Sequence, residues 1–351
     1  MVDPKLVSSR VPKKRATIKD VARASNVSPM TVSNVLNDKL QFVSSKTKAR
    51  VEREITRLNY RRQTAGRNLR SADQRSIGLV VVSDDSAFLE DQFAAKIAAG
   101  LANSLNKADY TLTVQGVRAD TLSDAMIMRN FDVAGVCAMV SGPIEVRNRV
   151  VNQLHALSQP LILFQQTNTE EVDDLCTIRL DEHASGEIIG DHLLARGVRS
   201  ILALRPKQHW FAIERRFEGI QKAMSNTTGT PTFTVLKAES ESQISVQTVL
   251  EDFLKKNPLP DAIVGGNDQI ALAAMLLMVD RGISVPKDVR VAGFNGFEAH
   301  RYLRPQLTTV ASPAYDLGDR AGAIILNRLS SGSFSTHDIV LPAHFSPGGT
   351  T

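Results

Sequence analysis

The chain has 351 residues, of which 42% are hydrophobic and 23% charged, with a formal net charge of +5 and two cysteines. This composition is typical of a soluble protein of two or three domains, and it excludes the disulfide-rich and disordered classes. The apolar runs are too short for a transmembrane helix, and the basic N-terminus lacks the apolar segment of a secretory signal, so we expect a cytoplasmic protein. Cys137 and Cys176 lie in apolar runs, where we expect buried thiols in a reducing compartment.

The positive charge is concentrated in the first part of the chain. Residues 1–75 contain 18 lysines and arginines against 6 acidic residues, a net of +12, whereas the other 276 residues contain 24 against 31, a net of −7. Such asymmetry is typical of a nucleic-acid-binding module joined to a domain with another role. The run Lys13-Lys14-Arg15 belongs either to a disordered tail or to an arm that reaches DNA.

Residues 17–37, TIKDVARASNVSPMTVSNVLN, predict two short helices joined by a tight turn. Thr17 is a plausible N-cap, and Asp20 three residues later resembles a capping box. Ser28 can cap the second helix, because Pro29 then occupies the first turn, where its missing N–H costs nothing.

The second predicted helix has one apolar side and one side of small polar groups. Val32, Val35 and Leu36 share the apolar side, while Met30 and Asn34 lie opposite. A surface with almost no charge is unusual for a solvated helix, and it suits contacts with base edges in the major groove. The alternative is a helical hairpin inside an ordinary domain. We expect these residues to contact DNA: Thr17, Ser28, Pro29, Met30, Thr31, Ser33 and Asn34.

A third helix is predicted after Ser44 or Ser45. Val51, Ile55 and Leu58 form its apolar stripe, and its other faces are rich in lysine and arginine. Three such helices make a small bundle. Lys46 and Thr47, at the start of the third helix, are expected to contact phosphates, which set the register of a protein on DNA without reading its sequence.

A basic linker follows and completes a recognisable order of motifs. The segments TIKDVARASNVS, TVSNVLN, FVSSKT, RLNY, AGRNL and SIGLVV occur in an order that resembles the lactose-repressor/galactose-repressor (LacI/GalR) family of bacterial regulators. The resemblance implies a helix-turn-helix DNA-binding domain at 16–60 and a hinge helix at 61–75 that forms on DNA. It further implies that Leu69 enters the minor groove at the operator centre. Our own hypothesis is that Arg67 contacts nearby phosphates.

From Ser76 onward, apolar strand-like runs alternate with helical patterns. This repetition predicts an α/β fold with parallel sheets, long enough for two doubly wound lobes. The resemblance implies lobes of periplasmic-binding-protein type joined by three crossovers, which we expect near Leu180, near 306–309 and near Ser335. The lobes would comprise 76–179 with 309–335, and 180–306 with 336–351. The predicted strands are 77–82, 110–115, 135–140, 161–164, 176–180, 201–204, 233–236, 262–264 and 289–294.

Ligands of open α/β sheets bind at the carboxyl ends of the strands. Four such ends carry polar residues, after 82, 178, 265 and 293. The resemblance implies that Arg216 holds a sugar oxygen, and that Asn295 replaces an aspartate that accepts from sugar hydroxyls. Asp268 can instead be a simple helix cap, and Asn295-Gly296 an ordinary turn. The candidate effector-binding residues are Asp84, Trp210, Arg216, Asn267, Asp268 and Asn295.

The loop 205–210 contains the only tryptophan of the chain, two cations and a histidine. A lone tryptophan often belongs to a core, but beside a cleft its ring can stack on a sugar. Because Asn295 removes a negative charge and Arg205, Lys207 and Arg216 add positive ones, one hypothesis is an anionic effector such as a sugar acid or sugar phosphate.

Residues 270–279, IALAAMLLMV, are apolar on every side, so the outer face of this helix requires a partner, either a loop or a second subunit. We therefore expect a homodimer on a pseudo-palindromic operator. The function that the sequence favours is a ligand-controlled transcription regulator, most simply a repressor. The alternative is a sugar-processing enzyme with an appended helical domain, for which no nucleotide, catalytic, cofactor or metal motif is found.

Overall fold

The computed structural model describes residues 16–36, 43–58, 60, 75–84, 88, 91–129, 133–167, 172–227, 229–298 and 302–351. The chain divides into two units, residues 1–74 with 126–132 and residues 75–125 with 133–351. The predicted hinge residues Arg67 and Leu69 lie outside the described residues. No helix in the described ranges is long and apolar enough to cross a membrane.

The first unit contains the predicted helix-turn-helix. Its helices are α1 (Ile18–Ala24), α2 (Pro29–Leu36) and α3 (Ser45–Arg57). The capping box is confirmed, because Asp20 N donates to Thr17 Oγ1 at 3.3 Å and Thr17 N donates to Asp20 Oδ2 at 2.8 Å. The three helices share one small core, whose buried members are Val21, Ala22, Val32, Val35, Val51 and Tyr60.

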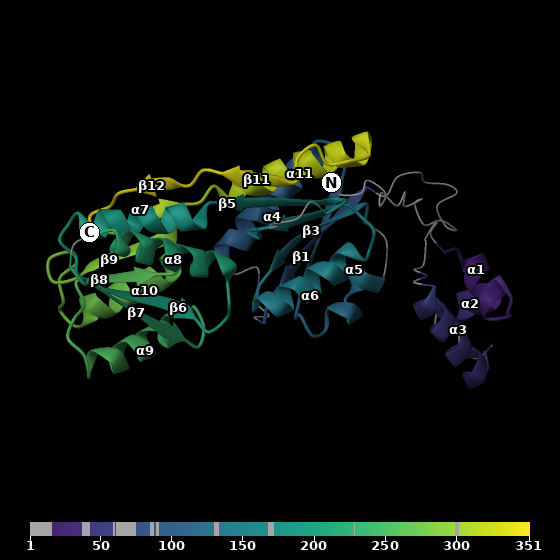
Figure 1. Ribbon diagram of the computed structural model, residues 1–351, viewed down its shortest axis with the longest axis horizontal. Coiled ribbons are helices and arrows are strands. Elements are labelled where there is room, and N and C mark those ends of the chain that lie inside the picture. The colour runs from purple at the N-terminus through teal and green to yellow at the C-terminus, as the bar shows by residue number, and fades with distance from the viewer. Residues whose placement is uncertain are drawn as a thin grey trace, which may run out of the picture. The chain divides into compact units, whose positions relative to one another are not determined.

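The second unit has two lobes, each built on a six-stranded sheet (Figure 1). The first sheet has the order β11-β5-β4-β3-β1-β2, and the second has the order β12-β10-β9-β8-β6-β7. Every strand pair is parallel except β10 with β12. The first-sheet strands are β1 (Ser76–Val82), β2 (Thr111–Val117), β3 (Gly135–Val140), β4 (Leu161–Phe164), β5 (Leu175–Leu180) and β11 (Asp338–Leu341). The second-sheet strands are β6 (Ser200–Pro206), β7 (Thr232–Ala238), β8 (Ala262–Gly265), β9 (Arg290–Asn295), β10 (Thr308–Ala311) and β12 (His344–Ser346).

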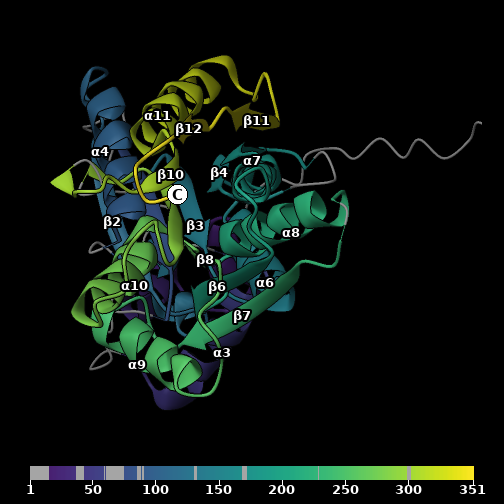
Figure 2. The ribbon, with the colours of Figure 1, turned by 90° about the vertical axis from the view of Figure 1, so that its left-hand side faces the viewer.

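Helices cover both faces of the second sheet. This is required because successive residues of a strand point to opposite faces, and in β6 the apolar residues on both faces are buried. Ile201 and Ala203 of β6 pack with α7 and α8, whereas Leu202 and Leu204 pack with α9 and α10 (Figure 2). The predicted doubly wound fold is therefore confirmed. The remaining elements are α4 (Gln92–Asn106), a 3-10 turn (Leu122–Asp124), α5 (Met126–Arg129), α6 (Ile144–His155), α7 (Glu182–Leu194), α8 (Phe211–Ser225), α9 (Gln243–Leu254), α10 (Asp268–Asp280) and α11 (Ala314–Ser331).

All nine predicted strands are present, but the last two crossovers lie later in the chain than predicted. The first crossover follows Leu180 as expected. β10 pairs with β9 of the second sheet, so the second crossover follows Ala311. β11 pairs with β5 of the first sheet, so the third crossover lies between Leu341 and His344, not near Ser335. The predicted lobe boundaries were wrong here because a four-residue strand has too few residues for its periodicity to be recognised.

Candidate functional site

A local hydrogen bond at its N-terminus caps α2. Ser28 Oγ accepts from Thr31 N at 3.1 Å, so the predicted cap is confirmed. Val32 and Val35 are buried on the inner side, while the Met30 side chain on the opposite side is 68% exposed. Ser28 and Pro29 are exposed, and Thr31, Ser33 and Asn34 are half-buried. The helix presents a thioether, hydroxyls and an amide without any charged side chain, which are groups that can contact base edges.

The other predicted DNA contacts lie at the starts of α1 and α3. Thr17 is exposed and caps α1. Ser44 caps α3, with Thr47 N donating to Ser44 Oγ at 3.3 Å, and Lys46 in the first turn of α3 is exposed. A helix N-terminus with an exposed lysine can hold a phosphate.

Between the lobes of the second unit lie two adjoining cavities. The inner cavity, about 60 Å³, is lined by four of the six predicted effector residues, Trp210, Arg216, Asn267 and Asn295. The outer cavity, about 670 Å³, is lined by the predicted Asp84 and also by Trp210. The inner volume holds no more than a few water molecules, so a sugar-sized ligand requires the lobes to open or must extend outward past Trp210.

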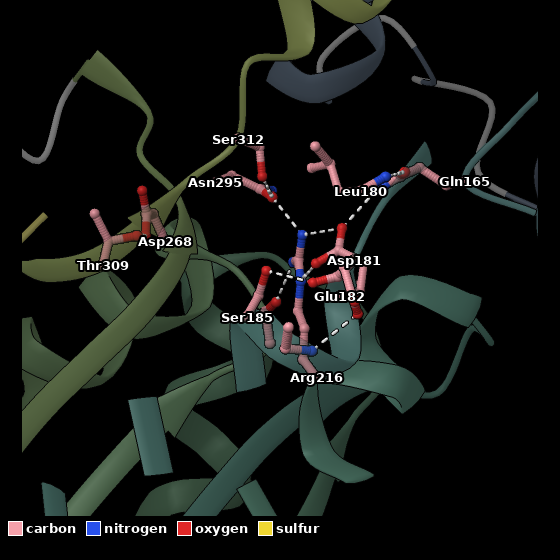
Figure 3. Close-up of polar contacts among 12 residues, drawn as sticks. Gln165, Leu180, Asp181, Glu182, Ser185, Arg216, Asp268, Asn295, Thr309 and Ser312 are labelled. Carbon is pink, nitrogen blue, oxygen red and sulfur yellow. Dashed lines mark hydrogen bonds and ion pairs between the residues drawn. The ribbon is translucent and has the colours of Figure 1, made fainter. Parts of the chain in front are cut away.

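Asp268 does not line either cavity. It is fully buried, and its carboxylate accepts from Thr309 Oγ1 at 2.7 Å and from Phe297 N at 2.8 Å. Burial raises the pKa of Asp268 to about 7 in spite of these hydrogen bonds. Asn267, not Asp268, caps α10, because its Oδ1 accepts from Ile270 N at 3.0 Å. Asp268 thus joins Thr309 of β10, which lies beside it in Figure 3, to the turn after β9 that contains Phe297.

Arg216 is the centre of a buried polar network (Figure 3). Its Nε and Nη2 donate to the two oxygens of Glu182 at 2.6 and 2.8 Å. Nη1 donates to Gly266 O at 2.8 Å, and Nη2 also donates to Asn295 Oδ1 at 2.7 Å. The side chains of Arg216 and Glu182 are only 3% and 6% exposed. This is a bidentate ion pair, the strongest type of carboxylate contact that arginine makes.

The network reaches both of the first two crossovers. Gln165, which follows β4 of the first lobe, donates from Nε2 to Glu182 Oε1 at 2.5 Å and accepts from Leu180 N at 2.8 Å. Ser312, in the second crossover, donates to Asn295 Oδ1 at 3.3 Å. Gln165 and Asn295 have φ values of 54° and 97°. Such left-handed backbone is uncommon outside glycine, and it is concentrated at ligand sites in proteins.

The three cations that suggested an anionic effector are each near a carboxylate. Arg216 pairs with Glu182, Arg205 Nη1 lies 3.8 Å from Glu214, and Lys207 forms an ion pair with Glu239. These carboxylates offset the positive charges on which the anionic-effector hypothesis was based, so the charge argument no longer favours an acid. The sequence did not reveal these pairs because each partner lies at least nine residues away in the chain, and proximity across such distances is not visible in the sequence.

Several cavity residues were missed by the sequence analysis. Gln165 and Gln166 follow the end of β4, so the strand-end rule would have identified them had it been applied to that strand. Asp91 caps α4 through Phe93 N at 2.8 Å, and burial raises its pKa. Aromatic rings form much of the inner wall, and apart from Trp210 nothing in the sequence marks them as lining. The missed inner-cavity residues include Asp91, Phe93, Phe164, Gln165, Gln166, Phe211 and Glu241.

Residues 207–210, here called the strap, connect the second lobe to the first. Gln208 Nε2 donates to Ser83 Oγ and to Ser141 Oγ, both at 2.9 Å, at the carboxyl ends of β1 and β3. Gly142 N donates to His209 O at 2.8 Å. Next to the strap, the Arg147 guanidinium of α6 lies 4.5 Å from the centre of the Phe211 ring. The strap therefore holds the two lobes together across the mouth of the cleft.

Comparison with known proteins associates both units with one group of regulators. Residues 17–63 match the model of "Bacterial regulatory proteins, lacI family", and residues 190–351 match that of the "Periplasmic binding protein-like domain". The HTH-type transcriptional repressor PurR of Edwardsiella ictaluri is 28% identical over 320 residues, covering 90% of this chain and 91% of the repressor. The ribose operon repressor of Bacillus subtilis is 25% identical over 339 residues, covering 96% and 98%.

The fold is also that of a solved repressor. The lac repressor dimer bound to operator and the anti-inducer ONPF aligns with a TM-score of 0.70 at 23% identity, covering 96% of this chain and 99% of the repressor chain. At this identity the likeness shows the architecture alone.

Proposed function

This chain belongs to the LacI/GalR family of bacterial transcription regulators, and from that membership we propose how its two surfaces work. It is a ligand-responsive, sequence-specific DNA-binding protein, and most simply a repressor. The two relatives described above are transcriptional repressors, which favours this function over a sugar-processing enzyme. The observation that carries the proposal is the pairing, in one chain, of an α2 that is uncharged and carries an exposed Met30 with a cavity between two lobes that is lined by both aromatic and polar side chains.

DNA recognition is assigned to α2 and to the helix starts around it. Met30 and Asn34 would contact bases, and Thr31 and Ser33 flanking phosphates. Lys46 and Thr47 would hold the backbone without reading sequence. By family resemblance, Leu69 would enter the minor groove, and we expect Arg67 to contact nearby phosphates.

A two-fold dimer would present two copies of α2 to a pseudo-palindromic operator. The outer face of α10 supports this proposal, because Leu276 and Val279 are 45% and 60% exposed while the inner face of the helix is buried. Two apolar side chains one helical turn apart can pack against the same pair on a second subunit.

The effector is assigned to the interlobe cleft and is an uncharged sugar-like molecule. Trp210 offers a stacking surface, and the amides of Gln165, Gln166 and Asn267 and the carboxylate of Asp91 can hydrogen-bond hydroxyl groups. Effector binding would change how the lobes close. DNA affinity would then change only to the extent that the effector binds the two lobe arrangements unequally.

The proposal is tested by selecting binding sites from random duplex DNA with the purified protein, in the presence and absence of a panel of neutral sugars. We expect an enriched motif with two-fold symmetry, and one sugar that changes the affinity for this motif at least tenfold. Enrichment of no motif, or of a motif without symmetry, would contradict the DNA-binding part. An affinity that no sugar changes would contradict the effector part.

A further inference from the structure

The guanidinium of Arg216 and its counter-ion occupy different positions relative to the cavity. Arg216, Gln165 and Asn295 line the inner cavity, whereas Glu182 does not. Glu182 begins α7 and touches Arg216 from behind, with both carboxylate oxygens engaged. A ligand in the cavity therefore meets a cation whose charge is balanced by a residue that the ligand does not touch.

Close packing of two helices fixes this arrangement. A Cβ on Gly186 of α7 would lie 1.9 Å from Arg216 O, and a Cβ on Gly219 of α8 would lie 2.0 Å from His183 O. The two helix backbones thus approach more closely than side chains would allow. The close approach brings Glu182, one turn before Gly186, against the guanidinium and leaves little freedom for the pair to separate.

The hydrogen-bonding capacity of Arg216 is also nearly exhausted. Four of its five N–H groups donate to Glu182, Gly266 O and Asn295 among the described residues, and one on Nη1 remains. A ligand carboxylate needs two parallel N–H groups for bidentate binding. A single hydroxyl oxygen needs one.

Asn295 also favours an uncharged ligand over an acid. Its Oδ1 accepts from both Arg216 and Ser312, and these two donors define which amide atom is the oxygen. Asn295 lines the cavity, and its amide carries no charge.

We propose that Glu182 is the specificity-determining residue for effector charge: by neutralising Arg216 from behind, it makes the cleft select uncharged ligands over acids of the same shape. The proposal rests on the proposed function, because it concerns the effector of that same cleft. Glu182 acts through Arg216 and is not itself an effector ligand.

The test is a thermal-shift titration of the full-length protein with matched probes. The probes are glucose and galactose, their uronic acids glucuronate and galacturonate, and their 2-amino derivatives. For the wild-type protein we expect at least tenfold tighter apparent binding of one neutral sugar than of its uronate. Glu182→Gln leaves the guanidinium charge unbalanced, so the uronate should gain at least tenfold relative to the neutral sugar.

A matched control removes the carboxylate that pairs with a neighbouring, partly exposed arginine. Glu218 pairs with Arg215, one residue before Arg216, and both side chains are over a third exposed. Glu218→Gln should leave the ratio of neutral sugar to uronate unchanged. A change as large as that in Glu182→Gln would mean that net charge alone sets the ratio, which overturns the proposal.

Should Glu182→Gln fail to fold, Asn295→Asp carries the test. If Glu182 already balances Arg216, a second carboxylate makes the cluster negative, and the amino sugar should gain at least tenfold relative to the neutral sugar. No gain would mean that the Arg216 charge was available to the new carboxylate, which overturns the proposal.

If no probe binds the wild type or any variant, the sugar effector itself is contradicted. If a neutral sugar binds and Glu182→Gln leaves its preference over the uronate unchanged, only the role of Glu182 is contradicted.

Discussion

The two binding surfaces of this protein are held in shape by contacts of very different range. Around α2, the capping hydrogen bonds of Thr17 with Asp20 and of Ser28 with Thr31 join residues three apart. Around the cavity, Arg216 contacts residues 34, 50 and 79 positions away. A substitution in a surface held by local contacts affects only the neighbouring residues. In a surface held by contacts between distant segments, a change at one residue is passed to all of those segments. The first suits fixed reading of DNA, and the second suits a response to a ligand.

The largest effect should come from breaking the long-range network. Arg216→Met leaves the Glu182 carboxylate buried without its cation, which typically costs about 3–5 kcal/mol of unfolding free energy. Urea denaturation of the full chain measures this loss. Arg215→Met is the matched control because its pair with Glu218 is exposed, and we expect a change within about 0.5 kcal/mol. Equal losses of unfolding free energy in the two variants would contradict the claim that the buried long-range network is what stabilises the cavity.

A second long-range contact should make core stability depend on pH. His192 of α7 contacts Thr351, 159 residues later, at 2.7 Å, and burial together with the nearby Arg196 lowers the pKa of His192 to about 4. The unfolded chain takes up this proton near pH 6.5 and the folded chain only near pH 4, so the unfolding free energy should fall as pH decreases through that window.

The measurement is the melting temperature at intervals from pH 7.5 to 4. His192→Gln cannot titrate, so this part of the slope should disappear in the variant. A slope identical in both proteins would assign it to other groups.

A smaller effect is expected from a local contact of the first unit. Thr17→Ala removes the cap of α1 and should cost about 1 kcal/mol. Hydrogen exchange of the α1 amides in the full chain should detect the loss there, while the amides of β1 and β3 stay unchanged. Thr56→Ala, at an exposed position of α3, provides the control. Loss of protection throughout the core would show that the local contact has distant consequences.

The smallest effect on stability should come from the reading surface itself. Met30→Ala and Asn34→Ala should each change the unfolding free energy by less than about 0.5 kcal/mol, yet reduce discrimination between the selected motif and its single-base variants by about 1–3 kcal/mol. Lys46→Ala should weaken binding to all duplexes about equally. Competition binding with matched and mismatched duplexes measures both. The same discrimination ratio in all three variants would contradict this division.

The range of these contacts also explains which features the sequence could predict. The capping box, the turn and the nine strands depend on residues near one another in the chain, and their patterns are repeated often enough to be read. Arg216 and Asn295 were identified by resemblance. Glu182 was not, because its role arises from α7 and α8 packing together, and β11 was missed because four residues at a sheet edge carry little pattern. The charge argument for an anionic effector has the same limitation of range, since the sequence shows the cations without the carboxylate partners that folding brings to them.

The strap across the cleft should affect the rates of ligand binding and release as well as the affinity. A ligand that reaches the inner cavity must pass Trp210, which lines both cavities, while Gln208 is bonded to Ser83 and Ser141. We expect entry and exit to wait for those bonds to break, so the opening rate of the strap would limit both association and dissociation. An effector held in this way would have a long residence time. The regulatory state of the protein would then outlast brief fluctuations in effector concentration.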